Sequence, residues 1–134
     1  MKIVSLCFFI FFASVNYCCA ADFIVHKIIY IHELPDDRVN FSPVEQIKLS
    51  DKRVYIYAFW EFFKLGKYKY KCEIYDASNR PLYQIEDTIN VTNRIWETWT
   101  WYDIRKNIDA HGTWTFKILI NNKVVKKCSL KVIK

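Results

Sequence analysis

Three histidines and four serines are the residues after position 21 that are best suited to hydrolytic chemistry. A hydrolytic zinc ion needs three protein ligands around one point, and a catalytic serine needs an adjacent, oriented base. His26 and His32 share one face of an alternating segment, but strand geometry places them about 20 Å apart. His111 lies much later, beside Asp109. The sequence therefore predicts no catalytic residues, and an enzyme would need His26, His32 or His111 to converge with carboxylates in one pocket.

Glu33, Asp36 and Asp37 form a small acidic segment close to Asn40. Carboxylate and amide oxygens are the ligands that calcium prefers. Adjacent aspartates beside a proline are also common in turns, because their side chains accept hydrogen bonds from nearby backbone N–H groups. We expect a turn here, and the sequence predicts neither a metal site nor a cofactor.

Four large aromatic residues, Trp96, Trp99, Trp101 and Tyr102, lie within seven positions. If Trp99 and Trp101 point inward, then Trp96 and Tyr102 point outward and form a flat apolar surface. Such a surface stacks on sugar rings or anchors a protein partner. The alternative is that both faces are covered, one by the core and the other by a loop or the N-terminal strand. Trp96 and Tyr102 are the predicted contact residues.

Four lysines alternate with inward-facing positions on two predicted strands: Lys69, Lys71, Lys127 and Lys131. If the two strands share a sheet, these side chains form one basic face. A face of this kind attracts anionic lipid headgroups or acidic glycans. It equally suits a solubilising surface that blocks sheet-to-sheet association. No motif for reading nucleic acid accompanies the lysines, and we do not expect a nucleic-acid partner.

Residues 1–21 have the pattern of a secretory signal peptide. Lys2 precedes an apolar run of about a dozen residues, and small residues come before Asp22. The apolar run is shorter than the about 20 residues that span a bilayer. The alternatives are an uncleaved anchor and a lipid on Cys18 or Cys19. We expect a secreted or periplasmic protein that is not inserted in a membrane after cleavage, with a net charge of +5 once Lys2 is removed.

Cys72 and Cys128 are the two cysteines after the predicted leader. An even pair in an exported protein predicts one disulfide. The bond would close a loop of about 57 residues, worth roughly 4 kcal/mol in the chain-entropy description. The alternative is two thiols that never meet.

The length of 134 residues allows one domain, predicted here over residues 22–134. It excludes a TIM barrel or a full dinucleotide-binding fold. The two glycines in the chain exclude a phosphate-cradling loop, which needs several residues with positive φ.

Apolar and polar residues alternate with a period of two along most of the chain, which is typical of half-buried strands. Seven or eight strands are predicted, with a helix-like turn over 103–110. Their ranges are 22–33, 44–50, 53–63, 68–76, 82–92, 95–102, 113–120 and 123–133. This spacing favours an antiparallel β-sandwich, with a small closed barrel as the rival.

The closing hairpin carries a pattern of alternating residues and turn residues: Gly112, Trp114, Phe116, Ile118, Asn121-Asn122, Leu130 and Val132. The earlier turn Tyr75-Asp76-x-x-Asn79 adds to this pattern. Together they give the segment from about residue 52 to 132 a resemblance to uncharacterised exported bacterial domains with an immunoglobulin-like fold. The resemblance implies a domain that binds or spaces other molecules and has no catalytic residues. The antibody pattern of cysteines is not followed, because Cys128 falls on the last predicted strand instead of the penultimate one.

These observations together predict an exported, non-enzymatic, immunoglobulin-like β-sandwich with one disulfide. It would serve as a binding or structural module for an unknown protein or glycan partner. The alternative function is a carbohydrate-binding module that uses surface tryptophan and tyrosine.

Overall fold

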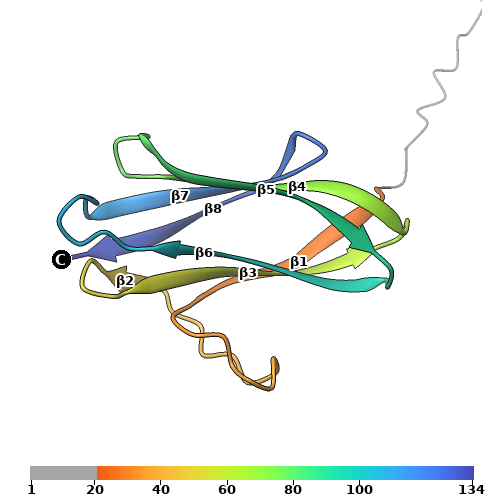
Figure 1. Cartoon of the computed structure of the whole chain (residues 1–134), viewed down its shortest axis with the longest axis horizontal. Coiled ribbons are helices and arrows are strands. Elements are labelled where there is room, and N and C mark those ends of the chain that lie inside the picture. Colours follow the sequence, from red (N-terminus) through yellow and green to blue (C-terminus); the bar gives the residue numbers. More distant parts are fainter. Residues whose placement is uncertain (1–20) are drawn as a thin grey trace, which may run out of the picture.

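A computed structural model describes residues 21–134, which form two facing β-sheets (Figure 1). The predicted signal peptide lies, apart from Ala21, outside the described residues. The eight strands of the described part are β1 (Phe23–Ile31), β2 (Gln46–Lys48), β3 (Arg53–Phe62), β4 (Gly66–Tyr75), β5 (Pro81–Val91), β6 (Ile95–Asp103), β7 (Gly112–Ile120) and β8 (Lys123–Ile133).

The first sheet has three antiparallel strands in the order β1-β3-β6. Its central strand, β3, alternates strictly, as the sequence predicts. Val54, Ile56, Ala58, Trp60 and Phe62 are all buried on the inner side. The odd-numbered residues of β3 point away from the core, so this strand has a defined inner and outer face.

The second sheet has five strands in the order β2-β8-β7-β4-β5 and curls like half of a barrel (Figure 1). Its β7–β8 hairpin turns at Asn121 and Asn122, whose φ angles are 49° and 66°. Asparagine tolerates this left-handed conformation, which suits a two-residue hairpin. The prediction of a wholly antiparallel arrangement is wrong at one edge, because the short β2 pairs with β8 in parallel.

The core lies between the sheets and contains two fully buried tryptophans, Trp60 and Trp114. Both indole N–H groups have partners. Trp60 Nε1 donates to Thr98 Oγ1 at 2.8 Å, and Trp114 Nε1 donates to the Ala110 carbonyl oxygen at 2.8 Å. A buried N–H without an acceptor costs free energy, so these two bonds allow large aromatic rings to fill the core.

The predicted strands are confirmed to within a few residues, and the helix-like turn predicted over 103–110 corresponds to a single turn. The N–H of Asp109 donates to the Arg105 carbonyl oxygen at 2.8 Å, which closes one turn before β7 begins. No helix occurs in residues 21–134.

The predicted disulfide is wrong, because Cys72 and Cys128 are free thiols. Both lie on the five-stranded sheet, but β7 runs between them: Cys72 is opposite Ile118, and Cys128 is opposite Phe116. Two strand spacings amount to about 9.6 Å. This exceeds the separation of about 7 Å between α-carbons beyond which a disulfide cannot form without backbone movement.

The two thiols lie near the hydroxyl of Tyr30, whose ring packs on Phe116 with centroids 5.2 Å apart. Burial, followed by the neighbouring Cys128, raises the pKa of Tyr30 above its usual range. Burial also raises the pKa of Cys72 to about 12 and that of Cys128 to a lesser extent. These three groups are therefore neutral at physiological pH.

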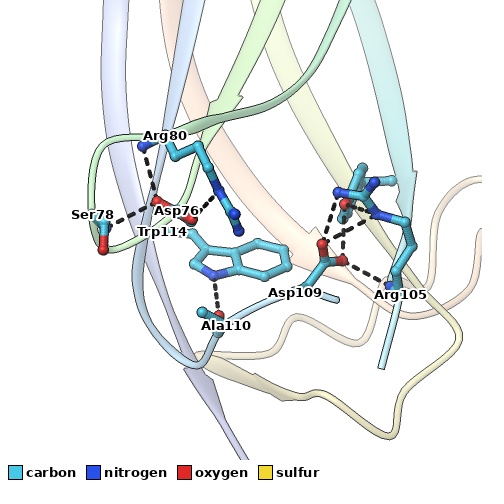
Figure 2. A network of polar contacts seen from close by, with 8 residues as sticks. Asp76, Ser78, Arg80, Arg105, Asp109, Ala110 and Trp114 are labelled. Atoms are coloured by element: carbon cyan, nitrogen blue, oxygen red, sulfur yellow. Dashed lines mark hydrogen bonds and ion pairs between the residues drawn. The ribbon is translucent and has the colours of Figure 1, made fainter. Parts of the chain in front are cut away.

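Two turns with buried aspartates flank Trp114 at one end of the molecule, as Figure 2 shows. In the β6–β7 connection, Asp109 accepts hydrogen bonds from the hydroxyl of Tyr102 at 2.8 Å and from Arg105 Nη2 at 2.9 Å. In the β4–β5 turn, Asp76 accepts from the N–H of Arg80 at 2.9 Å and from Arg80 Nε at 3.0 Å. Because the carboxylates are paired, both turns are fixed against the core.

The β4–β5 turn also packs closely on the start of β7. Gly112 has a φ of +132°, and a Cβ added there would lie only 2.5 Å from the Cβ of Ala77. Glycine is therefore required at this position both for its backbone conformation and for the close approach of the turn.

The two thiols provide a first test of the fold. We expect iodoacetamide at pH 8, without reductant, to modify Cys128 before Cys72, because Cys72 is fully buried whereas Cys128 is partly exposed. Peptide mapping after denaturation should recover both residues as alkylated thiols. A peptide pair joined through Cys72 and Cys128 would contradict the register.

Asp76→Asn provides a second test. We expect it to lower the free energy of unfolding by about 1–2 kcal/mol at pH 7, because the charge-assisted bonds to Arg80 are weakened. The N–H of Arg80 is the main cause that holds the pKa of Asp76 below its ordinary 3.8. A lowered pKa stabilises the fold above the unfolded pKa, and this stabilisation is lost as the pH falls below about 4. Urea unfolding should therefore show the wild type and variant converging in acid; a constant difference would contradict the assignment.

Candidate functional site

The outer face of β6 carries two exposed tryptophans. Trp99 is opposite Tyr57 and Trp101 is opposite Tyr55 in the β3–β6 register, so both share the outer face of β3. Their exposed fractions are 41% and 42%. The surface formed by Tyr55, Trp99 and Trp101 is called the aromatic strip below.

The prediction that Trp96 and Tyr102 point outward is wrong. Trp96 is opposite Trp60 and Tyr102 is opposite Val54, and these partners line the core. Tyr102 is buried, and burial is the main cause that raises its pKa to about 12. The inner parity of β6 is set by Thr98, which accepts the hydrogen bond from Trp60 Nε1.

Aromatic residues on both parities of β6 conceal its orientation in the sequence. The charged residues of β6 reveal its orientation, because Glu97 and Asp103 are odd-numbered and therefore lie on the same face as Trp99 and Trp101. Charged side chains are rarely buried unless they are paired. Their positions were the signal that could have identified the outer face.

A loop covers the half of the outer face nearest β1. Segment 32–45, drawn from orange to yellow, lies outside the three-stranded sheet (Figure 1). Its Leu34 and Phe41 pack on Ile29, Ile31 and Tyr57, all of which are buried. The prediction of a covering loop therefore holds for this half of the face. Toward β6 the same loop contributes the guanidinium of Arg38, which lies over the ring of Trp99.

Rings and cations hold the aromatic strip in place. Trp99 stacks on Tyr57 with centroids 5.8 Å apart and an interplanar angle of 9°. The Arg38 guanidinium lies 4.6 Å from the centre of the Trp99 ring, and that of Arg53 lies 5.6 Å from Trp101. Cations over aromatic faces are attracted by the ring quadrupole. Arg53 is also paired with Asp103 at 2.5 Å, so its charge is compensated. Both guanidinium groups therefore hold the tryptophan rings in place, and nothing in the sequence pattern placed Arg38 there.

A narrow groove adjoins the strip, between the edge strands β5 and β6. It has a volume of about 270 Å³ and is lined by both sheets, including Ile85, Asp87, Trp96 and Trp99. At its base, the hydroxyls of Tyr70 and Thr100 lie 3.2 Å apart. Trp96 thus borders this groove instead of the outer surface.

The four predicted lysines do lie on one sheet, since β4 and β8 both flank β7. They differ in their partners. Lys69 forms an ion pair with Glu86 at 2.9 Å, and Lys71 forms one with Glu73 at 2.9 Å. Lys127 and Lys131 have no ion-pair partner among residues 21–134.

The remaining candidate residues are dispersed. His26 contacts Glu61 at 2.8 Å, and His32 lies 3.8 Å from Asp51. His111 lies in the β6–β7 connection. The structure does not bring the three histidines together.

The acidic loop is organised as a turn. The carboxylate of Asp37 accepts hydrogen bonds from the N–H groups of Val39 and Asn40 at 2.9 and 3.1 Å. Within residues 21–134 there is no cluster of three or more metal-ligating side chains. That part of the chain also holds no helix of the length and hydropathy needed to cross a membrane.

The sequence matches no known protein family and no curated protein. Among solved structures, it is similar to part of an alkylpurine DNA glycosylase from Pseudomonas fluorescens, bound to DNA containing an abasic-site analogue. The TM-score is 0.57 at 9% identity, over 85% of this chain and 31% of the glycosylase. A β-D-glucoside glucohydrolase from Trichoderma reesei gives a TM-score of 0.45 at 9% identity, over 82% of this chain and 18% of that one.

This chain therefore spans less than a third of either protein. At 9% identity, the similarity to the glycosylase shows a shared fold alone.

Iodide quenching tests the assignment of the exposed tryptophans. We expect Trp99→Phe and Trp101→Phe each to lower the iodide-accessible fraction of tryptophan fluorescence, because these two rings face solvent. Trp60→Phe and Trp114→Phe should leave that fraction unchanged or raise it. If Trp96→Phe removed more accessible fluorescence than Trp99→Phe, the orientation of β6 would be wrong.

Proposed function

We propose that this chain is an exported, non-enzymatic binding module whose contact surface is the aromatic strip. The observation that carries the proposal is the 41% and 42% exposure of Trp99 and Trp101 on one face of an edge strand. Large aromatic residues contribute most of the binding energy at many interfaces.

The edge position of β6 supports a binding role over a purely structural one. Proteins normally protect an open edge with lysine, proline or a bulge. β6 contains no lysine and no proline, and its pairing with β3 has no register shift. Its charged residues are Glu97 and Asp103. An edge strand without lysine, proline or a bulge that also carries exposed tryptophans is expected where a partner docks.

The finer fold class is an immunoglobulin-like sandwich. In such domains, strands B and E share one sheet, while C, F and G share the other. Here β3 and β6 share one sheet, and β4, β7 and β8 share the second. Trp114, near the start of β7, bonds back to Ala110 as a tyrosine does at the corner before strand F in many immunoglobulin domains. This connectivity supports the proposed class.

Export to the periplasm or the cell exterior is proposed from residues 1–21 alone. Their short apolar run after Lys2 and the small residues before Asp22 support a cleaved leader.

Carbohydrate binding is the second candidate function, favoured by the geometry of the strip. Trp99 and Trp101 are two residues apart on one strand, so their side chains emerge about 7 Å apart on the same face. The stacking of Trp99 on Tyr57 holds its ring in one orientation. Fixed aromatic rings in a row on a sheet suit the apolar faces of consecutive sugar units.

The double variant Trp99→Ala/Trp101→Ala tests the proposed function. We expect it to abolish retention on immobilised polysaccharides, if glycan is the ligand, or enrichment of one protein from an envelope extract, if protein is the ligand. Losing two exposed aromatic anchors should weaken binding by at least about a hundredfold. Affinity electrophoresis and quantitative pull-down provide the two measurements.

Phe63→Ala is the matched control, because Phe63 is 50% exposed but lies in the β3–β4 connection, away from the strip. Binding that survives the double variant, or that is lost equally in Phe63→Ala, would contradict the role of the strip.

A further inference from the structure

A second concave surface lies at the open end of the β7–β8 hairpin, where β7 begins and β8 ends. It belongs to the five-stranded sheet, whereas the aromatic strip belongs to the three-stranded sheet. This cleft has a volume of about 470 Å³. Its polar side chains are those of His111, Thr113, Ser129, Lys131 and Lys134, and no carboxylate side chain lines it. Apart from the hydroxyl groups of Thr113 and Ser129, the polar side chains of the cleft are basic, so the cleft is suited to a negatively charged group.

A pair of lysines extends the charge beyond the cleft. Lys117 on β7 is directly opposite Lys127 on β8. Like charges at opposite positions of an antiparallel pair destabilise a sheet. The acid nearest in the register, Glu73, is opposite Lys117 on the other side and is paired with Lys71 at 2.9 Å, while the ammonium of Lys117 lies 4.6 Å from the centre of the Tyr75 ring.

The register places hydroxyl groups between the positive charges. Thr115 is opposite Ser129, and Thr113 is opposite Lys131. Residues two apart on a strand share a face, so Lys127, Ser129 and Lys131 lie in a row along β8, about 14 Å from end to end. We refer to this row with Lys117 and the adjoining cleft as the basic row.

We infer that the basic row binds an acidic polysaccharide through its carboxylate or sulfate groups. Repeated negative charges on such a chain match lysines separated along β8, while the hydroxyls of Thr115 and Ser129 can donate to and accept from sugar hydroxyls. The cleft at Lys131 takes one charged substituent.

The shape of the sheet favours a flexible polymer over a membrane surface. The five-stranded sheet curls around the core, so its outer face is convex (Figure 1). A planar bilayer would touch a convex face along a narrow line and would not enter the cleft, whereas a glycan chain can follow both. The inference is independent of the proposed function, because the two surfaces lie on different sheets.

The experiment titrates the protein with dextran sulfate and, in parallel, with uncharged dextran. The test variant is Lys127→Gln/Lys131→Gln. The matched control, Lys67→Gln/Lys69→Gln, removes the same charge from β4 of the same sheet and keeps the ion pair between Lys71 and Glu73, so that Glu73 is not released to Lys117. We expect the test variant to raise the Kd for dextran sulfate at least about tenfold and the control by less than about twofold.

Two further arms separate this site from others. Trp99→Ala should leave the affinity for dextran sulfate unchanged even if it abolishes binding at the aromatic strip. Vesicles of anionic phospholipid and a DNA duplex, matched in charge concentration, should bind more weakly than dextran sulfate. Circular dichroism and thermal unfolding check that each variant is folded, and Lys131→Gln alone serves if the double variant is not.

The inference fails if dextran sulfate does not bind, or if the two double variants lose affinity equally, since that would indicate attraction by net charge alone. It also fails if vesicles or DNA bind more tightly than the polysaccharide.

Discussion

The hydrogen bond from the indole of Trp60 to Thr98 is the constraint on which the arrangement of the three-stranded sheet depends. Trp60 is fully buried, so its N–H must find an acceptor inside the core. Thr98 supplies it only if the even-numbered residues of β6 face inward. That single choice of parity buries Tyr102 and exposes Trp99 and Trp101. The surface proposed for binding is thus a consequence of satisfying one buried donor.

Much of the fold could be predicted from the sequence, because strands and turns are determined by residues that are close together in the chain. The alternation in β3 and β7 and the two asparagines of the last hairpin each act within a few residues, and all were confirmed. Pairing between strands that are far apart in the sequence is a long-range property, and two predictions that depended on it were wrong: the disulfide and the wholly antiparallel arrangement. Nothing near Cys72 or Cys128 reveals that β7 runs between them. The orientation of β6 failed for a different reason, since aromatic residues occupy both of its parities.

The sequence predicted an aromatic surface and a basic surface, but it did not identify which residues form each of them. The sequence left open whether the four lysines share a sheet. They do, but ion pairs with glutamates distinguish Lys69 and Lys71 from Lys127 and Lys131. Arg38 comes to Trp99 from a loop more than fifty residues earlier, and Lys117 becomes part of the basic row only through its register with Lys127. Contacts of this kind depend on tertiary geometry and leave no pattern in neighbouring residues.

The separation of the two cysteines by β7 has a consequence for how the chain matures. Its native state contains no covalent link between distant segments of residues 21–134, so reaching that state requires neither an oxidant nor a thiol-exchange catalyst. A reducing and an oxidising compartment are therefore equivalent environments for the folding of this domain.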